Sequence, residues 1–224
     1  MPRTRIKICG ITRPADAAHA ALAGADAIGF ILYPHTPRAV SIDTARAILA
    51  AIPPFVTAVA LFVDQPLDDI RRAASDLGLG HIQLHGHESP EFVAALAPLS
   101  VLKAIPVRPD RLAADLTPWK NPPPNLVGLI LDSHSPQAGG AGVLNDFDTI
   151  ASLITQNYFA ALPPLIAAGG LNPANVASVI DRLHPWAVDV SSGVESQKGI
   201  KDPAMVERFI NAVRAQDAKS VASD

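Results

Sequence analysis

Arg5–Thr12 reads RIKICGIT, and this stretch indicates the fold that the rest of the chain repeats. Its isoleucines alternate with basic residues up to Cys9, Gly10 ends the run, and Thr12 follows as a helix-starting residue. Short β-branched runs that stop at a glycine are typical of buried parallel strands. The stretch therefore predicts a strand, a tight turn and a helix over Thr12–Ala23.

Runs of the same kind recur along the chain, separated by segments with helix-start signals. Ser89, Asn172 and Asp202 each stand before a proline, which is the order of a helix cap and a first helical residue. Ser41 and Asp146 are further capping candidates. The eight predicted strands are Arg5–Cys9, Ala25–Leu32, Val56–Phe62, His81–Leu84, Val101–Ala104, Val127–Leu131, Leu165–Ala168 and Ala187–Val190.

Eight strands alternating with about eight helices, without a break in composition, predict an α/β fold: a single (β/α)8 TIM barrel over residues 1–215. The polar residues 216–224 are expected to form a frayed tail. An open doubly wound sheet is the alternative. It usually carries a glycine-rich turn after the first strand, and the turn at Cys9–Thr12 lacks the G-x-G-x-x-G pattern.

Composition narrows the class of protein. The chain has 224 residues, of which 49% are hydrophobic and 17% charged, so it can bury a sizeable core. A net charge of −3 gives no bulk attraction to nucleic acid or anionic membranes. A single cysteine cannot form an internal disulfide, and no apolar run has the length of a signal peptide or a spanning helix. We expect a cytoplasmic protein.

Two neighbouring strand ends are rich in glycine and serine, and they predict a phosphate site. Gly169-Gly170 follows the seventh strand, and Ser191-Ser192-Gly193 follows the eighth. Glycines let backbone N–H groups approach an anion, and barrels often hold a phosphate between these two loops. The alternative is that both segments are ordinary turns.

Cys9 and Asp132 end the first and sixth strands. These strands lie on opposite sides of an eight-stranded ring, so the two side chains can flank one small molecule and move protons on either face of it. The alternatives are a thiol that only packs and a carboxylate that only caps a turn. Gly10 is expected to keep the approach to Cys9 open.

Arg38 and His85 follow other strands at the same predicted mouth. Arg38 is either a solvated surface residue or a two-point clamp for a carboxylate. His85 is expected to form a polar wall of the pocket. The sequence His85–Glu88 has no second cluster of ligands to match it, so we predict no metal site.

The chain resembles the phosphoribosylanthranilate isomerases of tryptophan biosynthesis. The motifs that carry the resemblance run in order over nearly the whole chain, and the first and last are the most diagnostic. They are Lys7–Thr12, Gly29-Phe30, Thr36–Arg38, Gln83–Gly86, Leu131–Ser133, Gly139–Gly142, Ala168–Leu171 and Val188–Glu195.

The resemblance implies a (β/α)8 barrel that catalyses an Amadori rearrangement without a cofactor or metal. It converts N-(5-phosphoribosyl)anthranilate to 1-(2-carboxyphenylamino)-1-deoxyribulose 5-phosphate. Carried over by position, Cys9 resembles the general base and Asp132 the general acid. Arg38, Gln83, His85 and Asp189 resemble substrate-binding residues. The residues that resemble the phosphate cradle are Gly169, Gly170, Ser191, Ser192 and Gly193.

The sequence departs from the family pattern at two positions. Ala141 stands where the family commonly has threonine, and Thr149 stands where it commonly has an aromatic residue. These differences concern the conformation of loop Ser133–Asn145 and leave the expected reaction unchanged.

Three readings stay open besides this one. Another phosphosugar isomerase or a lyase of the same barrel group would use other catalytic residues, and a phosphosugar-binding barrel would have none.

Expected partners are a phosphoribosyl substrate, no nucleic acid and no membrane. The expected oligomeric state is a monomer or a weak homodimer.

Overall fold

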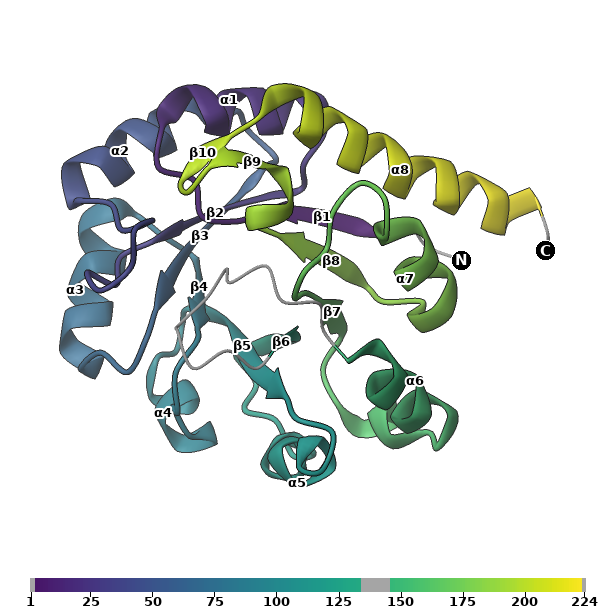
Figure 1. The fold of residues 1–224 in the computed structure, drawn as a ribbon. Coiled ribbons are helices and arrows are strands. Elements are labelled where there is room, and N and C mark those ends of the chain that lie inside the picture. Colours follow the sequence, from purple (N-terminus) through teal and green to yellow (C-terminus); the bar gives the residue numbers. More distant parts are fainter. Residues whose placement is uncertain (1–2, 134–145, 223–224) are drawn as a thin grey trace.

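The computed structural model describes residues 3–133 and 146–222, and it contains a closed barrel of parallel strands ringed by helices (Figure 1). The strands follow one another around the barrel in chain order, and β8 pairs with β1, which confirms the predicted (β/α)8 fold. The barrel strands are β1 (Arg5–Ile8), β2 (Ala27–Ile31), β3 (Thr57–Phe62), β4 (His81–Leu84), β5 (Ser100–Val107), β6 (Leu126–Ser133), β7 (Leu165–Ala167) and β8 (Ala187–Val190).

Helices connect the strands on the outside of the barrel. They are α1 (Pro14–Ala23), α2 (Ile42–Ala51), α3 (Leu67–Leu77), α4 (Pro90–Ala95), α5 (Leu112–Leu116), α6 (Phe147–Thr155), α7 (Val176–Leu183) and α8 (Pro203–Ala222). Short 3₁₀ turns occur at η1 (Thr117–Trp119), η2 (Tyr158–Ala161) and η3 (Ser192–Val194). No helix within the described part of the chain is long and apolar enough to cross a membrane.

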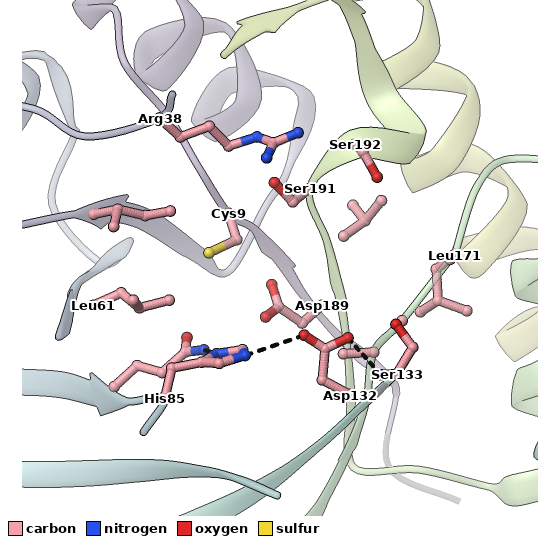
Figure 2. A pocket seen from close by; sticks show the side chains of 16 residues that line it. Cys9, Arg38, Leu61, His85, Asp132, Ser133, Leu171, Asp189, Ser191 and Ser192 are labelled. Carbon is pink, nitrogen blue, oxygen red and sulfur yellow. Dashed lines mark hydrogen bonds and ion pairs between the residues drawn. The ribbon is translucent and has the colours of Figure 1, made fainter. Parts of the chain in front are cut away.

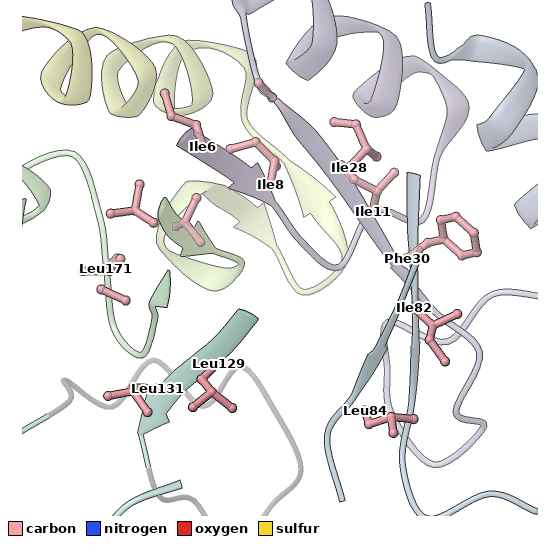
Figure 3. Packing of buried hydrophobic residues seen from close by; sticks show 14 of the residues in the cluster. Ile6, Ile8, Ile11, Ile28, Phe30, Ile82, Leu84, Leu129, Leu131 and Leu171 are labelled. Atoms are coloured by element: carbon pink, nitrogen blue, oxygen red, sulfur yellow. The ribbon is translucent and has the colours of Figure 1, made fainter. Parts of the chain in front are cut away.

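The main hydrophobic core lies between the barrel and the helices (Figure 3). Ile6, Ile8, Ile28 and Phe30 point outward from β1 and β2, and each is at most 1% exposed. Because side chains alternate along a strand, the residues between them point into the barrel. On β1 this alternation turns Lys7 inward.

Side-chain caps explain where two of the helices begin. Ser41 accepts a hydrogen bond from the Thr44 amide at 3.1 Å, and Asp146 accepts one from the Thr149 amide at 3.0 Å. Thr149 also donates its hydroxyl to Asp146, so this departure from the family pattern takes part in a cap. Each such cap contributes about 1 kcal/mol to helix stability.

The start of α7 differs from the sequence-based expectation. Asn172 was expected to cap a helix beginning at Pro173, but α7 begins at Val176. The Asn172 side chain accepts hydrogen bonds from the Ala174 and Asn175 amides instead. This Asx turn competes with the helix for the same backbone donors and delays its start.

The C-terminal residues also differ from the expectation of a frayed tail from residue 216. Helix α8 continues to Ala222, and Gln216 is only 8% exposed. Asp217 accepts hydrogen bonds from the Thr4 amide at 2.8 Å and from the Thr4 hydroxyl at 2.7 Å. Tertiary contacts therefore hold residues whose small polar character suggested disorder.

A hairpin interrupts the last strand–helix connection. Strands β9 (Glu195–Gln197) and β10 (Ile200–Lys201) pair antiparallel between β8 and α8. Asp16 of α1 accepts a hydrogen bond from the Lys201 amide, and Thr12 donates one to the Gly199 carbonyl. The hairpin is thereby fixed to the first strand–helix unit, beside the carboxyl ends of β1 and β8.

Asp217→Ala should destabilise the protein by about 1.5–3 kcal/mol, because it removes an ionised acceptor and leaves the buried Thr4 groups without it. Urea unfolding followed by circular dichroism measures this change. The control is Asp76→Ala, at an exposed carboxylate near the end of α3, which should stay within about 0.5 kcal/mol of the parent. Equal stability of Asp217→Ala and the parent would show that the contact between Asp217 and Thr4 adds nothing to the stability of the domain.

Candidate active site

A polar pocket opens at the carboxyl ends of the barrel strands (Figure 2). Cys9 reaches it from the end of β1, His85 from β4, Asp132 from β6 and Asp189 from β8. Arg38 reaches it from the loop between β2 and α2. Side chains that the sequence spreads over 180 residues thus line one cavity, as the strand order of a closed barrel requires.

Cys9 lies on the floor of this pocket among apolar side chains. It is 5% exposed and packs with Ile31 and Leu61. Burial raises the pKa of the thiol, while the neighbouring Lys7 ammonium acts in the opposite direction. The thiol is therefore shielded from water yet faces the cavity.

Asp132 faces the same cavity from the opposite side of the barrel. Its Oδ2 lies 3.4 Å from His85 Nε2, and its Oδ1 accepts a hydrogen bond from the Ser133 amide at 2.8 Å. Burial raises the pKa of Asp132 and lowers that of His85. Both shifts act in the direction of the neutral forms, so the Asp132 carboxyl is easier to protonate than an exposed one.

Gln83 lies behind His85. Its Nε2 is 3.0 Å from His85 Nδ1, and the residue is 1% exposed. The amide orients the imidazole ring toward Asp132. Gln83 Oε1 and Asp189 Oδ1 are buried in the pocket wall, and neither has a hydrogen-bond partner in the described part of the protein.

Arg38 is buried and held from one edge. Its Nε and Nη2 donate to the two carboxylate oxygens of Glu195 at 2.8 and 2.7 Å. Lys201 donates to the same carboxylate at 2.9 Å. Glu195 thus binds the Nε–Nη2 edge of the guanidinium. The solvated-surface alternative for Arg38 is wrong, since the side chain is 4% exposed.

Gly10 leaves room for two residues of the pocket wall. It has φ +71°, and a Cβ there would lie 2.7 Å from both Arg38 Cδ and Ser191 Oγ. The absence of a side chain thus lets these two residues take their places. That Gly10 also keeps the approach to the pocket open stays a prediction.

The two glycine-rich loops meet at one end of the pocket. Gly169 and Gly170 have φ of +85° and +70°, and together with Ser191 and Ser192 they line the cavity. Gly193 does not line it. A Cβ on Gly193 would lie 1.8 Å from the Leu171 carbonyl oxygen, so this glycine allows the two loops to pack against each other.

Sequence reasoning missed Lys7, Glu195 and Lys201, all of which are buried beside the pocket. Lys7 and Glu195 lie within the family motifs, but no signal in the sequence pairs them with residues that are distant in the chain.

The segment 134–145, with Ala141 and its neighbouring glycines, lies outside the described residues. Among the residues described, no three His, Cys, Asp or Glu side chains converge as metal ligands.

Comparison with known proteins identifies the family. A family model described as N-(5'-phosphoribosyl)anthranilate isomerase matches residues 6–212. The chain belongs to this family. The phosphoribosylanthranilate isomerase of Pseudomonas fluorescens is 44% identical over 216 residues, covering 96% of this chain and 97% of its own. That of Leptothrix cholodnii is 42% identical over 219 residues, covering 98% and 94%.

Solved phosphoribosylanthranilate isomerases share the fold. The crystal structure from Thermotoga maritima has a TM-score of 0.85 at 38% identity and covers 95% of this chain and 99% of its own. A second crystal structure, with a TM-score of 0.82, 35% identity and the same coverage, is in complex with reduced 1-(o-carboxyphenylamino)-1-deoxyribulose 5-phosphate. A third is of monomers generated from the dimeric Thermotoga maritima enzyme, at 34% identity and a TM-score of 0.81 over 95% and 99% of the two chains.

Glu195→Gln should raise KM for the carboxylate-bearing substrate by about 10-fold or more, because a neutral amide holds the guanidinium less firmly than a carboxylate. Steady-state kinetics measures the change, and kcat should fall less than kcat/KM. The control is Glu91→Gln, at an exposed site in the first turn of α4, which should leave KM unchanged. An unaltered KM in Glu195→Gln would mean that Arg38 keeps its place without the ion pair.

Proposed function

We propose that the chain catalyses the Amadori rearrangement of N-(5'-phosphoribosyl)anthranilate to 1-(2-carboxyphenylamino)-1-deoxyribulose 5-phosphate, in the tryptophan pathway. The observation that carries the proposal is a shielded thiol and a half-buried carboxyl on opposite sides of one pocket (Figure 2). Family membership supplies the substrate. The pocket supplies an anion-binding end, an arginine and two groups for proton transfer.

Asp132 acts first in this proposal. It protonates the ring oxygen of the ribose, and the lone pair of the anilino nitrogen opens the furanose to an iminium. Burial raises the pKa of Asp132, which supports this role because a higher pKa makes the protonated carboxyl more available near neutral pH. The lowered pKa of His85 supports it too, since a positively charged imidazolium beside Asp132 would favour the ionised carboxylate.

Cys9 acts second. Its thiolate removes the proton from C2, which the iminium has made acidic, and the electron pair moves into an enolamine. The enolamine becomes the ketone when C1 gains a proton and the 2-hydroxyl loses one. Atoms balance because the reaction is an isomerisation, and the thiol and carboxyl return to their starting states without a redox partner.

Substrate orientation uses the remaining polar groups. Arg38, held by Glu195, presents its remaining N–H donors to the anthranilate carboxylate. The phosphate lies between the Gly169-Gly170 turn and the Ser191-Ser192 turn, where backbone N–H groups and hydroxyls are available. Asp189 Oδ1, buried without a partner, accepts a hydrogen bond from the substrate and stabilises the positive iminium.

The physiological setting belongs to the same proposal. A cytoplasmic location is supported by the biosynthetic role of the family. A monomeric or weakly dimeric state is consistent with the Thermotoga maritima relative, from whose dimer monomers were generated.

Cys9→Ala and Asp132→Asn should each lower kcat by about 10²–10⁴-fold, the usual contribution of a general base or acid. Cys9→Ser should be similarly poor, because an alcohol provides almost no anion near neutral pH. The assay follows the loss of phosphoribosylanthranilate fluorescence at saturating substrate, with circular dichroism as the control for folding. If folded Cys9→Ala keeps more than about a tenth of the parental kcat, the thiol only packs and the proposed base is wrong.

The pH profile of kcat/KM should be bell-shaped with a broad top. Burial raises the pKa of both Cys9 and Asp132. The ordinary gap of about 4–5 units keeps the carboxyl below the thiol. The form with a thiolate and a protonated carboxyl is then a minor one. Its population is constant between the two pKa values and falls outside them.

Asp132→Asn separates the two limbs of this profile. Because this variant has no carboxyl to titrate, the bend at the carboxyl pKa should disappear from the profile. The residual kcat/KM should then rise with pH until the thiol is ionised. If Asp132→Asn has the parental pH profile and the parental rate, Asp132 takes no part in the mechanism. If kcat/KM of the parent does not change with pH, neither Cys9 nor Asp132 takes part.

A further inference from the structure

Lys7 is a buried lysine that the proposed reaction does not use. Its side chain is 5% exposed, inside the barrel, and its Nζ lies 2.9 Å from Asp189 Oδ2. Lys7 and Asp189 are direct partners in the register of β1 and β8. A lysine rarely occupies such a place, because loss of hydration costs several kcal/mol that one ion pair repays only in part.

The Lys7 ammonium and the Cys9 sulfur are neighbours beside Gly29. The two residues are two positions apart on β1 and so share the inner face of the barrel. A Cβ on Gly29 would lie 2.8 Å from Cys9 Sγ and 3.1 Å from Lys7 Nζ, so both atoms border the space that this glycine leaves open. Gly29, on the neighbouring strand β2, thus gives Lys7 room to extend toward the thiol.

The buried charges around Cys9 do not balance when the thiol is protonated. Three cations surround the floor of the pocket: Lys7, Arg38 and Lys201. Two anions accompany them, Asp189 and Glu195. Asp132 and His85 face the same cavity from β6 and β4 but belong to neither of these ion pairs; burial raises the pKa of Asp132 and lowers that of His85. Within the ion-paired cluster, a thiolate at Cys9 would supply the missing negative charge.

We propose that Lys7 is a positioning residue for the general base: its ammonium stabilises the Cys9 thiolate, and Asp189 holds that ammonium beside the sulfur. Asp189 then has two roles, since Oδ2 binds Lys7 and Oδ1 stays available to the substrate. The inference rests on the proposed role of Cys9 as the base.

The directions of the electrostatic effects agree with this geometry. Burial raises the pKa of the thiol most strongly, Lys7 lowers it by charge and by hydrogen bonding, Asp189 raises it and Lys201 lowers it. Loss of Lys7 therefore removes a lowering influence and leaves both raising ones. The thiol pKa must rise further when Lys7 is neutralised.

Lys7→Met tests the inference without substrate. Cys9 is the only cysteine, so ultraviolet absorbance of the thiolate against pH reports one group, with Cys9→Ala as the blank. The thiol pKa should rise by about 1 unit or more, the usual effect of removing an opposite charge at this range. The matched control is Lys103→Met, which removes another buried lysine, the partner of Glu88, and should leave the thiol pKa unchanged.

Enzyme kinetics gives a second readout that loss of packing would not produce. In Lys7→Met the high-pH limb of kcat/KM should move upward with the thiol pKa. The top of the profile should fall by the same factor, about 10-fold per unit, because the thiolate becomes rarer. A variant damaged only in its packing would lose rate without moving the limb.

Lys7→Met leaves Asp189 without its ammonium and can fail to fold. The double variant Lys7→Met/Asp189→Asn removes one positive and one negative charge, so the net charge buried at this site is unchanged. Its thiol pKa should also lie above that of the parent, because the lowering effect of Lys7 is the larger of the two. A thiol pKa equal to the parental value in the folded single or double variant overturns the inference. Failure of the proposed function looks different, since the parent would then show the titration but no turnover.

Discussion

Closure of the sheet between β1 and β8 is the constraint on which the rest of the structure depends. The pairing sets Lys7 opposite Asp189 and brings Cys9 beside the loop that follows β8. It also completes the ring that places Asp132 across the cavity. In an open sheet the first and last strands would be far apart, so Lys7 would lack its carboxylate partner and the thiol would lack the serine-rich turn. The pairing of β1 with β8 thus both closes the barrel and brings the polar residues of the pocket together.

A shortage of negative charge follows from this closure. The hairpin after β8 carries Glu195 and Lys201 over the end of β1, where Arg38 joins them. The resulting cluster is dry and retains one cation in excess. Such a site favours any group that can become an anion within it, whether the thiol of the free protein or the carboxylate and phosphate of a ligand. In the proposed reaction the same surplus of positive charge would favour both ligand binding and formation of the thiolate.

The strands could be predicted from the sequence because each is a short β-branched run, and β4 and β8 have the expected bounds. Cys9 and Asp132 could be predicted as pocket residues because they stand at the ends of predicted strands. The start of α7 was missed because Asn172 forms its own turn, a choice that depends on local backbone energies. The ordered end of α8 was missed because Asp217 binds Thr4, a contact across the whole chain. Glu195 was missed as the partner of Arg38 for the same reason: no local pattern encodes it.

The pairing of the first strand with the last also affects how the protein is made. A chain emerges from the ribosome with β1 first, so Lys7 and Cys9 are exposed long before Asp189 exists to pair with them. Until residues 187–190 have been synthesised, one edge of β1 has no partner strand, and its lysine is better hydrated than enclosed. The barrel must then close late, around a charge that stays in water until the opposite charge arrives. Burial of Lys7 becomes favourable only when nearly the whole barrel is present, so the ion pair with Asp189 favours closure of the barrel late in folding.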